Sequence, residues 1–165
     1  MKLIAVSGGH FAKVDDADFE RLSQLTWHLS DSGYAIRRVG PRAGPKVTVR
    51  MHLVVFGANI ELDVDHRDGD KLNCQRENLR AATRTLNNAN SRPRVGCSSR
   101  FKGVAWVKGY GRWWAYINRD GKRKNLGYFD DEIEAALAYN AAAPALFGEF
   151  ARINVIPIGA HHARE

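Results

Sequence analysis

The chain has 165 residues, enough for one medium domain or two small ones. Hydrophobic residues make up 44% of it and charged residues 26%, so we expect a folded protein rather than a disordered one. No apolar run approaches the ~20 residues of a membrane span, and the apolar stretch at the start is too short for a signal peptide. The two cysteines, Cys74 and Cys97, fit a reducing compartment, and we expect a cytoplasmic protein.

The net charge of +7 is unevenly distributed along the chain. Between Arg92 and Asp130 there are ten basic and two acidic residues, so this stretch carries +8 and the rest of the chain −1. A localised basic field is typical of a protein that binds a polyanion. A solvated basic surface is the alternative interpretation, but the uneven distribution favours nucleic acid as the partner.

The first third of the chain predicts two strands, a helix and a hairpin. Residues 3–7 and 11–15 are short and apolar, and Asp15 and Asp16 precede a helix expected at 17–25. Trp27 then fits the core of a module. A second pair of strands is expected from the alternation of apolar residues, at residues 34–39 and 46–57, the latter with Val47, Val49, Met51 and Leu53 on one face.

The segment VDHRDGDKLNCQRENLRAATRTLNNAN, residues 64–90, holds the candidate catalytic residues. We expect a strand at 61–66, a loop at 67–74, and a helix from Arg76 to Asn87 with apolar residues at 79, 82 and 86. His66 can serve as a general base, because its unperturbed pKa lies near ~6.5. Asp65 and Asn87 offer hard oxygen ligands that suit Mg²⁺, with Asn88 or Asn90 as alternatives to Asn87. Asp65 as a turn residue is the structural alternative, and Asp68 beside a glycine is read as one.

This segment resembles the HNH nuclease motif of phage and intron-encoded endonucleases. The resemblance is carried by VDHRDGD, RENLR and TLNNAN at matching spacing, and by VDDADFERLSQLTWHLSDSGYAIRR and MHLVVFG upstream, over most of residues 10 to 90. It implies a ββα-metal fold in which His66 is the general base and Asp65 and Asn87 hold one divalent ion, Mg²⁺ or alternatively Mn²⁺. It also implies that Asn78 bonds across the loop and orients the His66 backbone. His52 precedes a leucine where an arginine is common, and we interpret it as structural.

A basic linker, residues 91–100, separates the nuclease module, 1–90, from a second module at 101–156, and a tail follows at 157–165. Strands are expected at 102–109, 112–122 and 122–129, with a hairpin turn at Asp120-Gly121. A helix should follow, capped by Asp130 and Asp131 and kinked or shortened at Pro144, with Ile133, Ala136, Leu137 and Asn140 on one face.

Alternation along these strands separates a helix-facing set from an open set of side chains. Val104, Trp106, Trp113, Ala115, Ile117 and Leu126 should face the helix, whereas Ala105, Val107, Trp114, Tyr116, Asn118, Arg123 and Asn125 should face outward. An open sheet face can read base edges in a major groove. We expect phosphate contacts from Lys102, Lys108, Arg112 and Arg119, and minor-groove contacts from Arg92 and Arg94 in the linker. Packing for Trp114 and solvation for the linker arginines are the alternatives.

Residues 100–154 resemble the DNA-binding domain of plant ethylene-response (APETALA-type) factors, which is also found appended to phage HNH nucleases. The resemblance is carried by FKGVAW, RWWAYI, LGYFDDEIEAALAYNAAA and FGEFARIN. Together the two resemblances imply an α+β protein, a ββα-metal module followed by a three-stranded antiparallel sheet packed on one helix. The expected function is a monomeric endonuclease for double-stranded DNA in a bacterial host cell, homing-type or phage-encoded. A DNA-binding transcriptional regulator with a degenerate nuclease module is the alternative.

Overall fold

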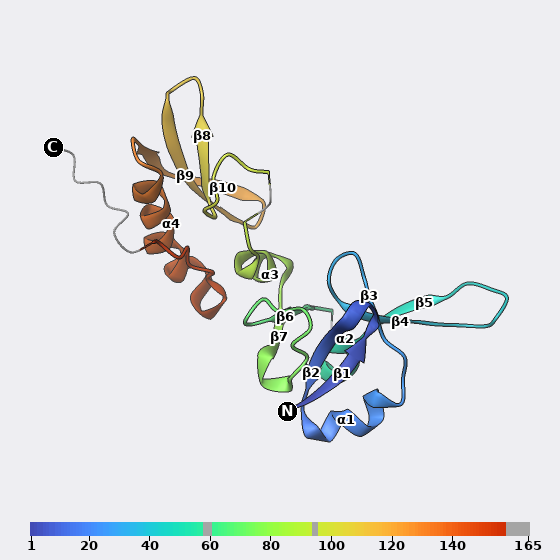
Figure 1. Ribbon diagram of the computed structural model, residues 1–165. Helices are drawn as coiled ribbons and strands as arrows, with labels where there is room; N and C mark the ends of the chain where they lie inside the picture. Colours follow the sequence, from blue (N-terminus) through green and yellow to red (C-terminus); the bar gives the residue numbers. More distant parts are fainter. Residues whose placement is uncertain (58–60, 94–95, 158–165) are drawn as a thin grey trace. The chain divides into compact units, whose positions relative to one another are not determined.

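A computed structural model describes residues 1–57, 61–93 and 96–157 (Figure 1). The chain forms two compact units, Met1–Arg84 and Thr85–Glu165, which we call the N-terminal and the C-terminal unit. Each has hydrophobic clusters of its own. Helices and antiparallel strands occur in both, so the fold is α+β as expected.

The N-terminal unit opens with the predicted hairpin and helix. Strands β1 (Lys2–Val6) and β2 (His10–Val14) pair antiparallel, and α1 (Asp16–Ser23) follows directly. Trp27 is 2% exposed, as predicted for a core residue, and its indole nitrogen donates to the Leu22 carbonyl at 3.0 Å. The hairpin and the indole thus contribute to one apolar core.

A three-stranded sheet continues this unit, with β3 (His28–Leu29), β4 (Ala35–Val39) and β5 (Val47–Arg50) in that order. The strand expected at 46–57 is wrong in its second half, because α2 occupies Met51–Phe56. Met51 and Val55, one helical turn apart, are both buried, whereas Val47 is 67% exposed. Gly57 ends the helix in the left-handed region at φ 83°, where a residue without Cβ is favoured.

A hairpin carries the candidate catalytic residues. Strand β6 (Asp63–His66) pairs antiparallel with β7 (Leu79–Ala82), and α3 (Arg84–Asn90) follows, so the chain order is β-β-α. The helix expected from Arg76 to Asn87 is therefore wrong in its first half. The spacing of residues 79, 82 and 86 is that of a helix, but the backbone of 79–82 forms a strand because it pairs with β6.

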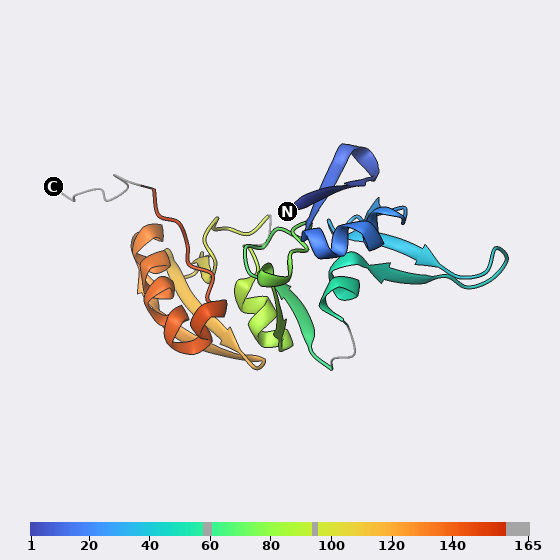
Figure 2. The same ribbon diagram turned by 90° about the horizontal axis from the view of Figure 1, so that it is seen from below.

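The C-terminal unit is the predicted three-stranded sheet with one helix. Strands β8 (Val104–Val107), β9 (Arg112–Arg119) and β10 (Lys122–Phe129) lie in the order β10-β9-β8, and α4 (Glu132–Phe147) runs along one face of the sheet (Figure 2). Asp120 and Gly121 both have positive φ, as the predicted hairpin turn requires. Val104, Ala115 and Ile117 are buried on the helix side, as predicted.

Helix α4 begins as predicted and extends beyond Pro144. The Asp131 carboxylate accepts from the backbone N–H groups of Ile133 and Glu134, which is an N-cap. The helix continues to Phe147, so Pro144 does not end it. Leu137, predicted on the buried face, is 39% exposed; the buried side chains are Ala135, Ala136, Tyr139, Ala143 and Phe147.

Helix α3 packs with the C-terminal unit. Leu86 and Ala89 join the cluster around Ile117 and Tyr139. The Lys102 ammonium donates to the carbonyls of Asn88 at 2.8 Å, Ser91 at 2.7 Å and Ala89. These carbonyls lie at the end of α3, where helical partners are lacking. Lys102, predicted to hold phosphate, thus fastens this helix.

We predict that Lys102→Ala lowers the free energy of unfolding of the C-terminal unit by about 1.5 to 3 kcal/mol, because it removes charge-assisted hydrogen bonds to backbone carbonyls. Urea denaturation of the full chain measures the change. Lys108→Ala is the matched control, since Lys108 is exposed and its removal is expected to leave the unfolding midpoint unchanged. Equal stability of the two variants would contradict a fastening role for Lys102.

Candidate active site

Asp65 and His66 lie on β6 and are each 4% exposed. The register of the hairpin puts Asp65 directly across from Arg80, which is 7% exposed. Arg80 Nη2 and the Asp65 carboxylate are 2.8 Å apart, and Arg80 Nε donates to the same oxygen, Oδ2, at 2.9 Å. A buried carboxylate needs such a partner. Arg80 therefore supplies the positive charge that faces the buried Asp65 carboxylate beside His66.

The His66 imidazole lies among aromatic rings. Its centroid is 4.8 Å from that of His52 on α2, edge to face, and 5.9 Å from that of Tyr34. Burial lowers the pKa of His66, and the nearby carboxylates of Asp65 and Asp68 oppose this by raising it. Because the net direction is downward, the imidazole is neutral at neutral pH, which is the form that can accept a proton.

Asn78 braces the loop that follows His66. Its side-chain amide donates to the Asn73 carbonyl at 2.8 Å and to Asp68 Oδ1 at 3.1 Å, while its side-chain oxygen accepts from the Asp68 backbone N–H. Its backbone carbonyl accepts from the N–H of Arg67, next to His66, at 2.9 Å. The bonds across the loop, expected from the family resemblance, are present at this residue.

The two predicted metal ligands, Asp65 and Asn87, belong to different units. Asn87 lies on α3, in the C-terminal unit, whereas Asp65 lies in the N-terminal unit. Within the described ranges no three His, Cys, Asp or Glu side chains gather into a metal cage. One carboxylate and one amide oxygen suit Mg²⁺, which keeps several waters and takes its other ligands from substrate phosphates. The donor types fit the ion, and the ligand assignment remains a prediction.

The open face of the β8–β10 sheet carries most of the residues predicted to contact DNA. Arg123 lies 4.4 Å from the ring of Tyr116 and 5.3 Å from that of Trp114, and it donates to the side chain of Asn118. Trp114 Nε1 donates to Asn125 at 2.8 Å. These five side chains form one exposed or half-exposed polar and aromatic surface, and base recognition by them remains a prediction.

Some of the predicted phosphate-contacting residues bond to groups of the protein, whereas others are simply exposed. Arg112 forms an ion pair with Asp130 at 2.8 Å, and Arg119 donates to the Leu146 carbonyl. Lys108 and Arg92 are exposed. Arg94 and most of the tail at 157–165 lie outside the described residues. Phosphate contact by these residues remains a prediction.

Comparison with known proteins supports the interpretation of the hairpin. A family model described as HNH endonuclease matches residues 52–89, from α2 to α3. An uncharacterized HNH endonuclease of Acanthamoeba polyphaga mimivirus is 31% identical over 160 residues, which cover 93% of this chain and 80% of that protein. The chain belongs to the HNH endonuclease family. Protein 3.8 of Escherichia phage T7 is 33% identical over 89 residues, 54% of this chain and 73% of that protein.

The structure of this HNH endonuclease brings three further residues close to the Asp65-His66 pair that the sequence did not single out. Arg80 directly follows the ENL triplet but was assigned to a helix, in which it would not face Asp65. Tyr34 and Lys71 are distant in sequence from His66, and Lys71 Nζ lies 4.8 Å from the Tyr34 ring. In the C-terminal unit, Tyr128 was not included among the outward-facing residues. A bulge between Asn125 and Gly127 shifts the alternation of β10, so a strict alternation places Tyr128 on the wrong face.

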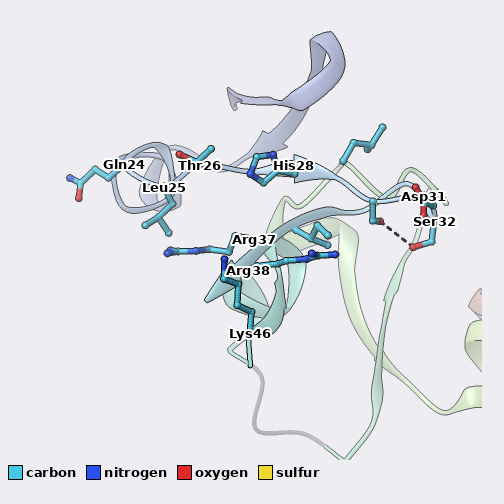
Figure 3. A pocket seen from close by; sticks show the side chains of 12 residues that line it. Gln24, Leu25, Thr26, His28, Asp31, Ser32, Arg37, Arg38 and Lys46 are labelled. Atoms are coloured by element: carbon cyan, nitrogen blue, oxygen red, sulfur yellow. Dashed lines mark hydrogen bonds between the residues drawn. The ribbon is translucent and has the colours of Figure 1, made fainter. Parts of the chain in front are cut away.

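A polar groove lies on the β3–β5 sheet of the HNH endonuclease (Figure 3). His28, Arg37, Arg38 and Lys46 line it with Asp31 and Ser32. Residues 28–50 hold five basic residues and one acidic residue, a net charge of +4. The N-terminal unit therefore has a local basic surface despite its nearly balanced composition. None of the described helices has the length and apolar character that crossing a bilayer requires.

The buried histidines predict acid sensitivity of the metal-free HNH endonuclease. Burial, together with the charges of His66 and Arg50, lowers the pKa of His52 to about 3. The unfolded chain takes up protons below pH ~6.5 that the folded chain does not, so stability falls as the pH drops through that value. We expect a loss of about 2 kcal/mol from His52 between pH 7 and pH 5.

Chemical denaturation at pH 7 and pH 5 measures this loss. His52→Gln should reduce the difference between the two pH values, whereas His10→Gln, which replaces an exposed histidine of the same unit, should leave it as in the wild type. A pH dependence unaltered in His52→Gln would show that His52 is not the group responsible.

Proposed function

We propose that this HNH endonuclease hydrolyses phosphodiester bonds of double-stranded DNA, as a monomer that requires one divalent metal ion. Mg²⁺ is the proposed ion, with Mn²⁺ as an alternative. The observation that carries the proposal is the buried His66 beside the Asp65–Arg80 ion pair on one strand, followed by a loop that the hydrogen bonds of Asn78 hold in place. The proposed setting is a bacterial host cell, for a homing-type or free-standing enzyme of phage or intron origin.

The roles follow from the chemistry of the side chains. His66 accepts a proton from the attacking water, which a neutral imidazole can do at neutral pH. Asp65 and Asn87 would hold the metal ion, which would supply positive charge to stabilise the phosphate and the leaving oxygen. Asn78 keeps the loop and the His66 backbone in position. Because a monomer has one such site, we propose cleavage of one strand per binding event.

The C-terminal unit is proposed to select the site of cleavage. We propose that it is an ethylene-response-factor-like domain whose open sheet face enters the major groove. Arg123, Asn118 and Asn125 would contact base edges there, flanked by Trp114 and Tyr116. Phosphates would be held by Lys108, Arg112 and Arg119, and the minor groove would be contacted by Arg92 and Arg94.

Incubation of the full chain with supercoiled plasmid DNA tests the proposed function. We expect conversion to open circles in Mg²⁺ and no conversion in EDTA, and sequencing of the cut ends should map a limited set of sites. Binding without conversion in Mg²⁺ or Mn²⁺ would instead support a DNA-binding regulator with an inactive nuclease module.

A further inference from the structure

Two cations lie on the ring of Tyr34 at the edge of the active site. The Arg50 guanidinium carbon is 5.5 Å from the ring centroid, and Lys71 Nζ is 4.8 Å from it. The same ring lies 5.0 Å from His52 and 5.9 Å from His66, between ring centroids. A single half-buried aromatic ring therefore contacts two exposed cations and also lies next to the buried imidazole of His66.

The strands and the loop hold both cations in place. Arg50 pairs with Ile36 across the β4–β5 ladder, and Tyr34 is two residues before Ile36, so alternation puts Arg50 and Tyr34 on the same side of the sheet. Lys71 lies in the loop that Asn78 braces, and its ammonium donates to the Ser32 carbonyl at 2.8 Å. The two cations thus come from separate segments and meet at one ring.

Neither cation is neutralised by a neighbouring carboxylate. Over the described ranges no ion pair joins Arg50 or Lys71 to an acidic side chain. Three carboxylates close in sequence to His66 contact other groups: Asp65 contacts Arg80, Asp68 contacts Asn73 and Asn78, and Asp70 contacts Lys13. Contact with an aromatic face orients a cation without cancelling its charge. The positive charges of Arg50 and Lys71 therefore remain available to bind an anion.

We propose that Arg50 and Lys71 form a phosphate-binding subsite that holds a backbone phosphate of the substrate strand beside His66. The inference rests on the proposed function, because it names the residues through which the active site binds the DNA backbone. Phosphate oxygens accept charge-assisted hydrogen bonds from guanidinium and ammonium groups. Because both cations contact the Tyr34 ring, this ring sets the distance between the bound phosphate and the His66 imidazole.

The test is the salt dependence of DNA binding by the full chain, measured in EDTA so that no cleavage occurs. The double variant Arg50→Gln/Lys71→Gln should lower the slope of log affinity against log salt by about two, because two phosphate contacts are lost. At low salt its affinity for a random duplex should fall by roughly 10- to 100-fold.

Two further variants separate charge from packing. Lys2→Gln removes one exposed positive charge from the same unit, away from Tyr34, and should change the slope little. Arg50→Lys/Lys71→Arg keeps both charges and should restore the wild-type slope. The proposal is overturned if the double glutamine variant keeps the wild-type slope, or if Lys2→Gln lowers it as much.

The failure of this inference is distinguishable from failure of the proposed function. If the wild type cuts no DNA in Mg²⁺ or Mn²⁺, the proposed function fails, while the slopes measured in EDTA still decide whether Arg50 and Lys71 contact phosphate. If the wild type cuts and the slopes are equal, the nuclease assignment stands and only the subsite is rejected.

Discussion

Replacing His66 with alanine is expected to lower the rate of DNA cleavage by about 10²–10⁴-fold, which is the contribution of a general base. DNA affinity should stay close to that of the wild type, because the largest basic stretch, from Arg92 to Asp130, is remote in sequence from His66. Single-turnover cleavage of supercoiled DNA gives the rate, and binding in EDTA gives the affinity.

The variant needs two controls, because His66 is buried against His52 and Tyr34. Thermal unfolding of His66→Ala establishes that the N-terminal unit is folded at the assay temperature. His10→Ala removes an exposed histidine of the same unit and should cut as the wild type does. If a folded His66→Ala protein cuts at the wild-type rate, another group is the base.

The second large effect is expected from separating the two units. A fragment of residues 85–157 should bind duplex DNA, with an affinity that falls about 10³-fold between 50 mM and 200 mM salt if about six phosphates are contacted. A fragment of residues 1–84 should bind weakly, because its thirteen basic residues are offset by eleven acidic ones. Electrophoretic mobility shifts over a salt series measure both.

The fragment boundary matters to this experiment. Leu86 and Ala89 on α3 pack in the C-terminal unit, so a fragment that begins at residue 95 would lose part of its core. Tight DNA binding by the 1–84 fragment would contradict the assignment of DNA binding to the C-terminal unit. A complex of the 85–157 fragment with DNA that is insensitive to salt would also contradict it.

Elements with strong local signals were predictable from the sequence. Asp131 caps α4, Asp120-Gly121 forms the hairpin turn, and Trp27 is buried, each as expected. These features depend on one or two residues whose backbone preferences or size leave few alternatives. Asp65 and His66 likewise lie on a strand, as expected.

Features that depend on contacts distant in sequence were not predictable. The apolar alternation of residues 47–53 fits a strand, yet α2 forms because Met51 and Val55 pack into a core built from β1, β2 and α1. Arg80 was assigned to a helix, and only its pairing with Asp65 across the hairpin reveals its role. Tyr34 lies 32 positions before His66, and no local pattern joins them.

The Mg²⁺ dependence of cleavage by Asp65→Asn tests the central claim most directly. Asparagine keeps the shape of Asp65 and can still accept from Arg80, whereas alanine would leave a buried guanidinium unpaired, at a cost of about 3–5 kcal/mol. We predict that Asp65→Asn cuts more slowly and needs at least roughly tenfold more Mg²⁺ for half-maximal rate, because the anionic ligand is lost. A rate and a Mg²⁺ titration identical to those of the wild type would contradict a metal-dependent nuclease site at Asp65 and His66.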